Sequence, residues 1–265
     1  MPFAQVNAAS IYYEQHGSGP DLVLLHGAGG NHLSWWQQIA AFSRHYRVTV
    51  YDARGWGRSR GDMAVGRFVL GTDLVALMEH LGIESAHVVA QSMGGRAVAG
   101  LTRIAPGRIR SLVLCGTTAG ATNDRIRELQ DELRDERGDA GLREYALARP
   151  FEEREPALAV LYRQINALNP PRPKAFLGRP PATYRGSQHD PLSALGVPIL
   201  FVVGEFDMIT SPAMIREANS LIPSSRFHEI KGAGHSAYFE AADEWNRVVG
   251  EFLAAAEARQ VAAPK

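Results

Sequence analysis

The sequence contains few cysteines, no net charge and no long apolar segment. Cys115 is the only cysteine among 265 residues, which excludes an internal disulfide and gives no cysteine spacing typical of a metal site. The 28 basic and 28 acidic residues balance, so no overall field attracts the chain to nucleic acid or to an anionic membrane. No apolar stretch approaches the roughly 20 residues needed to span a bilayer.

The opening residues, MPFAQVNAAS, have neither a basic start nor an apolar run, so we expect no secretory signal and a cytoplasmic location. A hydrophobic fraction of 45% and a charged fraction of 21% are ordinary for a soluble globular enzyme. With balanced charge and no long apolar run, we expect neither nucleic acid nor a membrane as a partner. The composition leaves the oligomeric state open.

Short β-rich runs alternate with amphipathic helical runs, which predicts a mainly parallel sheet covered by helices on both faces. The first 17 residues indicate an antiparallel hairpin. Continuous apolar runs, typical of strands buried on both faces, follow at 21–27, 47–55, 85–92, 108–116 and 197–207. A segment at 32–46 is expected to be helical, and RFHEI (226–230) to be the last strand.

The alternation stops at residues 119–190, where helical, charge-rich segments and Pro/Gly clusters replace the apolar runs. We interpret this region as a helical cap inserted into a core formed by residues 1–118 and 191–258. The last residues, 259–265, are expected to be a frayed tail.

Ser92 lies in VVAQSMGGRAV, where an apolar strand runs directly into a helix. A sharp strand-to-helix turn requires small residues two positions before and after its centre, and Ala90 and Gly94 occupy these positions. The turn exposes the hydroxyl at a helix N-terminus, so Ser92 is the candidate nucleophile. A serine that only caps the helix is the competing interpretation.

A serine hydroxyl needs a base, and the base needs a carboxylate that fixes its tautomer. His235 is the candidate base because it lies in a loop of small residues, KGAGHSAYFE, just after the last strand. Asp207 is the candidate acid because it ends the run VPILFVVGEFD, with Glu205 as the local rival. The carboxyl ends of parallel strands share one edge of a sheet, so all three side chains are expected there. His228 lies within the last strand, and His80 and His87 flank a helix–strand join, so these three fit packing or surface positions better.

Attack on a carbonyl creates an oxyanion that needs two fixed donors. We expect the backbone N–H groups of Met93 and of Ala28, which lies in the glycine-rich segment HGAGG (26–30). Gly29 of the same segment is a candidate substrate contact, and His26 is expected to organise the loop. HGAGG lacks the lysine and the acidic partner that a phosphate or dinucleotide loop requires.

Five short motifs, HGAGG, YDARGWGRS, AQSMGGR, GEFD and GAGHS, together resemble the α/β-hydrolase superfamily in order and spacing. The resemblance covers nearly the whole chain outside the cap and implies a mostly parallel eight-stranded sheet, a Ser-Asp-His triad, and neither metal nor organic cofactor. Alanine at position 90 departs from the usual G-x-S-x-G. Serine at position 92 argues against the family's epoxide hydrolases and haloalkane dehalogenases, which carry aspartate there.

The resemblance is to small single-cap enzymes, including carboxylesterases, enol-lactonases, carbon–carbon hydrolases and perhydrolases. We expect a small-molecule substrate, with hydrolysis of a small ester or lactone as the reaction. A carbon–carbon hydrolase or lyase with the same triad remains open. A hydrolase-like receptor with slow turnover also remains open. Arg96 resembles an arginine that contacts a substrate carboxylate in a lyase of this fold. With the cap residues Arg163, Arg172, Lys174, Arg179 and Arg185, it suggests a carboxylate-bearing substrate; a solvated cap face is the alternative.

Overall fold

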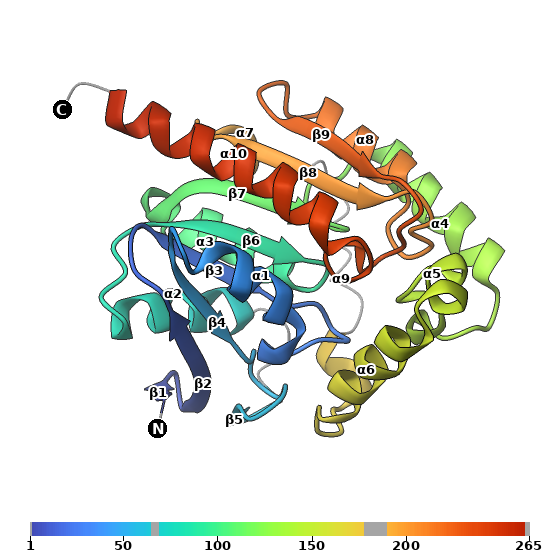
Figure 1. The fold of residues 1–265 in the computed structure, drawn as a ribbon, viewed down its shortest axis with the longest axis horizontal. Helices are drawn as coiled ribbons and strands as arrows, with labels where there is room; N and C mark the ends of the chain where they lie inside the picture. The colour runs from blue at the N-terminus through green and yellow to red at the C-terminus, as the bar shows by residue number, and fades with distance from the viewer. Residues whose placement is uncertain (1, 65–68, 178–189, 263–265) are drawn as a thin grey trace.

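The computed structural model describes residues 2–64, 69–177 and 190–262, which form one twisted sheet with helices on both faces (Figure 1). The sheet order is β1-β2-β4-β3-β6-β7-β8-β9, and the two-residue strand β5 pairs with β2 at its margin. The strands are β1 (Phe3–Val6), β2 (Ala9–His16), β3 (Asp21–Leu25), β4 (Arg47–Tyr51), β5 (Arg60–Gly61), β6 (Ala86–Gln91), β7 (Ile109–Cys115), β8 (Ile199–Gly204) and β9 (Arg226–Ile230).

The pairing directions confirm the expected topology. Strands β1 and β2 form the antiparallel hairpin, and β2 also runs antiparallel to β4 and β5. Every other neighbouring pair, from β4–β3 to β8–β9, is parallel. The short β5 is the addition to the eight strands expected.

The central strands are buried on both faces, as their continuous apolar runs predict. In β3, Leu22 and Leu24 contribute to one hydrophobic cluster, whereas Val23 and Leu25 contribute to the other. Successive side chains of a strand point to opposite faces, so one strand supplies both cores. Helices α2, α3 and α8 cover one face of the sheet, and α1 and α10 cover the other.

The helices are α1 (Trp36–Phe42), α2 (Val69–His80), α3 (Gly94–Ile104), α4 (Asp124–Arg137), α5 (Arg149–Arg154), α6 (Pro156–Ala167), α7 (Asp190–Ser193), α8 (Pro212–Ser220), α9 (Ala237–Glu240) and α10 (Ala242–Ala262). The 3-10 helices are η1 (His32–Trp35), η2 (Pro106–Arg108), η3 (Leu142–Tyr145) and η4 (Lys174–Leu177). The predicted helix at 32–46 thus begins as a 3-10 turn, which Asn31 caps by accepting from the Leu33 N–H at 3.0 Å. None of the helices described is long and apolar enough to cross a membrane.

The described part of the predicted cap, residues 119–177, contains helices and no strand. Helix α4 packs against α8, while α5 packs against α6. Figure 1 shows α4, α5 and α6 on the side toward which the arrowheads of β6 and β8 point. The last part of the predicted cap, 178–189, lies outside the described residues, and with it Arg179 and Arg185.

The side chains of two asparagines form hydrogen bonds between the cap and the core. Asn31 donates to the carbonyl of Ile165 in α6 at 2.8 Å. The Asn169 side chain accepts from the Gly57 N–H at 2.9 Å and donates to the Gly30 carbonyl at 3.1 Å.

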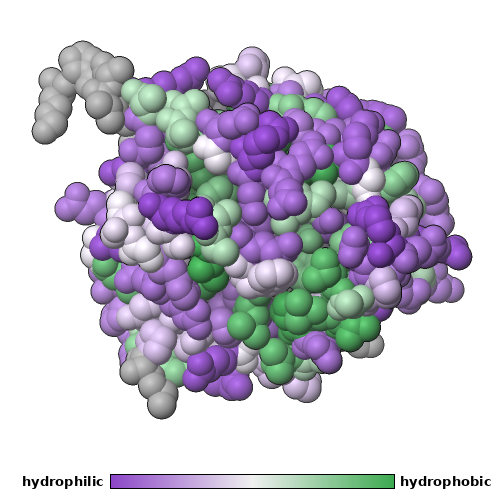
Figure 2. All heavy atoms as spheres, in the orientation of Figure 1, coloured by the Kyte–Doolittle hydropathy of each residue, from purple (hydrophilic) through white to green (hydrophobic). Residues whose placement is uncertain are grey.

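The surface over α1 and α6 is apolar (Figure 2). Exposed large apolar side chains in and next to these helices are Leu33, Trp36, Val160 and Leu168.

The end of the chain differs from the expectation. Helix α10 continues to Ala262, so residues 259–262, expected to belong to a frayed tail, extend the helix instead. Its inner residues Trp245, Val249 and Leu253 recur at helical spacing and are buried, which fixes the helix along its core face.

Candidate active site

Ser92 lies at the turn between β6 and α3, in a left-handed backbone conformation with φ of 49°. Residues other than glycine rarely adopt this conformation, and it is typical of strained functional turns. The Ser92 N–H donates to the carbonyl of Cys115 at 2.9 Å, which ties the turn to the end of β7. The side chain is half-buried and stands at the start of α3.

The residues around the turn are small for steric reasons. A β-carbon at Gly94 would lie 2.6 Å from the carbonyl oxygen of Leu25, so only glycine fits beside β3. Ala90 is completely buried within β6, where its methyl group is accommodated. The departure at position 90 therefore leaves the sharp turn intact.

The structure brings His235 and Asp207 together. Asp207 follows β8 and His235 follows β9, and both side chains are buried. The His235 Nδ1 lies 2.9 Å from Asp207 Oδ2 and 3.0 Å from Oδ1. The Asp207 Oδ1 also accepts from the N–H groups of Ile209 and Thr210, both at 2.8 Å. The carboxylate is thus fixed by its own loop and holds the imidazole with Nε2 directed away from it.

Three loops meet around Ser92. The Gln91 amide donates to the carbonyl of His235 at 3.2 Å, and a β-carbon at Gly27 would lie 3.2 Å from the β-carbon of Ser92. A β-carbon at Gly116 would lie 3.1 Å from both Asp207 Oδ2 and His235 Nδ1. Among the described residues, however, no hydrogen bond joins Ser92 Oγ to His235. The imidazole–carboxylate link is formed, and the hydroxyl–imidazole link is not.

The loop 26–30 contains one expected oxyanion donor, the Ala28 N–H, and the other, the Met93 N–H, directly follows Ser92. The Gly30 N–H donates to the Gly27 carbonyl at 3.0 Å, and the Trp56 Nε1–H donates to the Ala28 carbonyl at 2.9 Å. These bonds fix the loop, yet within the residues described here neither the Ala28 N–H nor the Met93 N–H has a hydrogen-bond partner. Unpaired backbone donors are what an oxyanion site requires.

His26 organises this loop, as expected. Its Nδ1–H donates to the Gly27 carbonyl at 2.7 Å, and its Nε2 accepts from the Ala53 N–H at 3.0 Å. Only the neutral ring can donate at one nitrogen and accept at the other. Burial lowers the pKa of His26, which favours the same neutral form.

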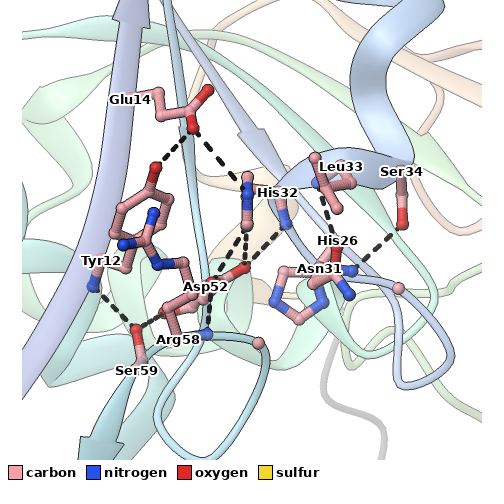
Figure 3. Close-up of polar contacts among 12 residues, drawn as sticks. Tyr12, Glu14, His26, Asn31, His32, Leu33, Ser34, Asp52, Arg58 and Ser59 are labelled. Atoms are coloured by element: carbon pink, nitrogen blue, oxygen red, sulfur yellow. Dashed lines mark hydrogen bonds and ion pairs between the residues drawn. The ribbon is translucent and has the colours of Figure 1, made fainter. Parts of the chain in front are cut away.

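The YDARGWGRS segment contacts His32, just after the loop 26–30, through Asp52 (Figure 3). Asp52 accepts from the N–H groups of His32 and Arg58, both at 2.7 Å, and pairs with His32 Nδ1 at 2.9 Å. Burial alone would raise the pKa of Asp52, but the contacts with His32, the nearby His26 and the Arg58 N–H together outweigh it, so the pKa is lowered and the carboxylate stays charged. We interpret this buried, hydrogen-bonded carboxylate as structural rather than catalytic.

Sequence reasoning missed Glu240, the last residue of α9. Its buried carboxylate accepts from the N–H groups on both sides of His235: Gly234 at 2.9 Å and Ser236 at 3.1 Å. It also accepts from the Ala148 N–H of the cap at 2.9 Å. Burial raises the pKa of Glu240 to about 7, although these N–H donors oppose the rise. Glutamate five residues after the histidine was the available signal, but its partners come from distant segments.

The rival candidates lie elsewhere or have other partners. Glu205 accepts from the Gly232 N–H at 2.9 Å and from Lys231 at 3.2 Å. His87 is buried between Ser111 and Glu257, each at 2.7 Å, and His228 bonds Glu244 at 3.1 Å. None of these contacts reaches the Asp207–His235 pair.

The arginines that were expected to face a substrate carboxylate have different partners in the structure. Arg163 is exposed and forms an ion pair with Glu152 on the cap surface. Arg96 donates to the Leu177 carbonyl at 3.3 Å and so contacts the cap. Arg172 stacks over the Trp56 ring at 4.0 Å, close to the Ala28 carbonyl. In the described ranges, no three His, Cys, Asp or Glu side chains are grouped to hold a metal ion.

Comparison with known proteins gives consistent relatives. RutD of Caulobacter sp. (strain K31), whose name assigns it provisionally to carbamate hydrolysis, is 27% identical over 92% of this chain and 95% of its own. A 2-hydroxy-6-oxononadienedioate/2-hydroxy-6-oxononatrienedioate hydrolase of Burkholderia vietnamiensis (strain G4) is 27% identical over 92% of this chain and 90% of its own.

A solved structure resembles the fold closely. The enol-lactonase of Burkholderia xenovorans LB400 is 25% identical, with a TM-score of 0.74 over 96% of this chain and all of its own. A family model for the alpha/beta hydrolase fold matches residues 20–242, which include the Ser92 turn and both loops of the Asp207–His235 pair. The chain belongs to the α/β-hydrolase family.

Proposed function

We propose that this protein is a serine hydrolase that cleaves a small carboxylic ester or lactone through an acyl-enzyme. The observation that carries the proposal is the strained Ser92 turn at the same sheet edge as the buried His235–Asp207 pair. A serine that only capped a helix would need neither the left-handed backbone nor a buried imidazole–carboxylate pair nearby. The enol-lactonase neighbour supports an ester-like bond as the target.

The mechanism follows from these groups. The Asp207 carboxylate keeps a proton on His235 Nδ1, so Nε2 is free to take the proton of the Ser92 hydroxyl. Closing the hydroxyl–imidazole link requires a side-chain adjustment on substrate binding, which is common where catalytic contacts tighten in the substrate complex.

The attacking oxygen then bonds to the carbonyl carbon, and the N–H groups of Ala28 and Met93 hold the negative oxygen. His235 donates its proton to the leaving alcohol oxygen, which leaves an acyl group on Ser92. Water, deprotonated by His235, then attacks the acyl carbon. The bond from this carbon to Ser92 Oγ breaks, Oγ takes the proton back from His235, and the acid is released. The steps require no group beyond this chain and water.

A second candidate is hydrolysis of a carbon–carbon bond next to a carbonyl. The relative from Burkholderia vietnamiensis carries this kind of substrate in its name, and that substrate is a dicarboxylate. The same three residues serve this reaction, since it also proceeds by attack on a carbonyl carbon and release of a stabilised leaving group.

A series of 4-nitrophenyl esters of two to eight carbons tests the proposal. We expect many turnovers per enzyme, with an initial burst equal to the enzyme concentration if deacylation is slower than acylation. A single slow burst without turnover would instead indicate a hydrolase-like receptor. Turnover of ring-cleavage diketones combined with no ester turnover would move the assignment to the carbon–carbon hydrolase.

A further inference from the structure

A cavity of about 460 Å³ is lined by residues of the predicted cap between positions 143 and 177. Its walls include Arg143, Asn166, Asn169, Arg172, Phe176 and Leu177. This volume suits a small organic molecule. Two guanidinium groups line it, and none of the described residues of its wall is acidic.

The two arginines lack the ion pairs that other cap arginines have. In the parts of the chain that the structure describes, neither Arg143 nor Arg172 has a carboxylate partner, whereas Arg149 and Arg163 on the outer cap surface are both paired. Arg172 is held by its stacking on Trp56 and by long contacts to the carbonyls of Gly55 and Ala28, at 3.4 and 3.5 Å. Its position is fixed while its charge is uncompensated.

Burial, and then the nearby charge of Arg143, lower the pKa of Arg172 to about 10. Two like charges beside one cavity repel each other, and a bound anion would relieve that repulsion. Guanidinium groups suit carboxylates because their donors match the two oxygens.

The wall of the cavity also contacts the loop 26–30 directly. Arg172 reaches the carbonyl of Ala28, whose N–H is a proposed oxyanion donor. A β-carbon at Gly29 would lie 3.0 Å from the Asn166 amide nitrogen, so the cavity wall touches this loop at a second point. A group bound between the arginines would be anchored beside the place where the carbonyl reacts.

We infer that this cavity is a carboxylate-binding subsite, formed by Arg172 and Arg143, that selects substrates bearing an anionic group away from the reacting carbonyl. The inference rests on the proposed hydrolase function and specifies its substrate class. It assigns selectivity to the cap segment 166–177 and to η3, and leaves bond cleavage to Ser92, His235 and Asp207.

The test uses two matched substrates, mono-4-nitrophenyl glutarate and its neutral methyl ester. We expect the full-length enzyme to prefer the anion in kcat/KM by about tenfold or more, the effect of one charge-assisted contact. Arg172→Gln and Arg143→Gln should each lower this preference by about tenfold, and Arg172→Lys should restore part of it. Arg163→Gln, the matched cap control, should keep the full preference. An equal preference in all variants would overturn the subsite.

A binding measurement separates this inference from the proposed chemistry. Glutarate should raise the Tm of the Ser92→Ala protein, and Arg172→Gln in that background should abolish the rise. If neither ester is hydrolysed but glutarate binding still depends on Arg172, the subsite stands and the hydrolase proposal fails. Glutarate binding that survives both arginine substitutions would refute the subsite even in an active esterase.

Discussion

The sheet edge and the cap build their halves of the site by different means. At the sheet edge, parallel strands β6, β7, β8 and β9 end together, and short backbone loops carry Ser92, Asp207 and His235. The cap is joined to this edge by side chains such as Asn31, Asn169 and Glu240, each bonded to a distant backbone group. The difference indicates that the positions of these three side chains follow from sheet register, whereas the placement of the cap depends on a seam of individual contacts.

The largest expected effect comes from replacing, one at a time, two acidic residues on the same loop. Asp207→Asn should lower kcat by roughly 10⁴-fold, because an amide can no longer hold His235 in the required tautomer. Glu205→Gln is the matched control two residues earlier, and its amide oxygen can still accept from Gly232. Steady-state kinetics on one ester suffice; equal losses in the two variants would disprove the assignment of the acid.

Glu240 bonds both the cap and the loop that carries His235, so its substitution tests the contact between the two regions. Glu240→Gln should lower kcat between about tenfold and a hundredfold, because an amide nitrogen would face an N–H beside His235 and shift that loop. Glu244→Gln on α10, where the glutamate side chain bonds His228 on the neighbouring strand β9, should keep kcat unchanged. If both variants kept full kcat, Glu240 would have no positioning role.

The pH dependence of stability gives a second reading of Glu240. Its pKa is raised from 4.5 to about 7, so the folded state binds a proton more tightly than the unfolded state. This contribution is fully present below pH 4.5 and is lost as the pH rises through 7. Relative to Glu240→Gln, the wild type should therefore lose up to roughly 3 kcal/mol of unfolding free energy over this window. Urea denaturation at pH 4.5 and pH 8 measures it, and a pH-independent difference would contradict it.

Asn169→Ala should weaken the seam with a smaller effect. It leaves the Gly57 N–H and the Gly30 carbonyl without their partner, which costs about 1–3 kcal/mol of unfolding free energy. We expect KM to rise more than kcat falls, because the catalytic loops keep their own bonds. Denaturation and kinetics on the same preparation check both parts, and a larger fall in kcat than rise in KM would show that the cap positions the catalytic groups.

The smallest effect should come from the outer cap surface. Arg163→Gln removes an exposed ion pair with Glu152, and such pairs contribute about 0–1 kcal/mol. Thermal unfolding should differ from wild type by no more than a few degrees. A large loss of Tm would mean that surface charges, rather than the asparagine contacts, fasten the cap.

The sequence predicted the two halves unequally, for physical reasons. Continuous apolar runs located β3, β6 and β8, and residues that follow such strands must meet at one edge, which identified Ser92, Asp207 and His235 as candidates. Contacts across the seam follow no local rule. The Asn169–Gly57 bond joins residues 112 positions apart, and the three donors around Glu240 come from the cap and from both sides of His235. Arg143 lines the cavity only because η3 folds back toward 166–177.

Covalent labelling tests the central claim most directly. A fluorophosphonate reacts rapidly with a serine whose hydroxyl is activated by a base and whose developing oxyanion is held. We predict one adduct per chain, located by peptide mass spectrometry on Ser92, abolished in Ser92→Ala and slowed at least a hundredfold in His235→Ala. No adduct on the folded wild-type protein, or an adduct on another serine that persists in Ser92→Ala, would contradict the account.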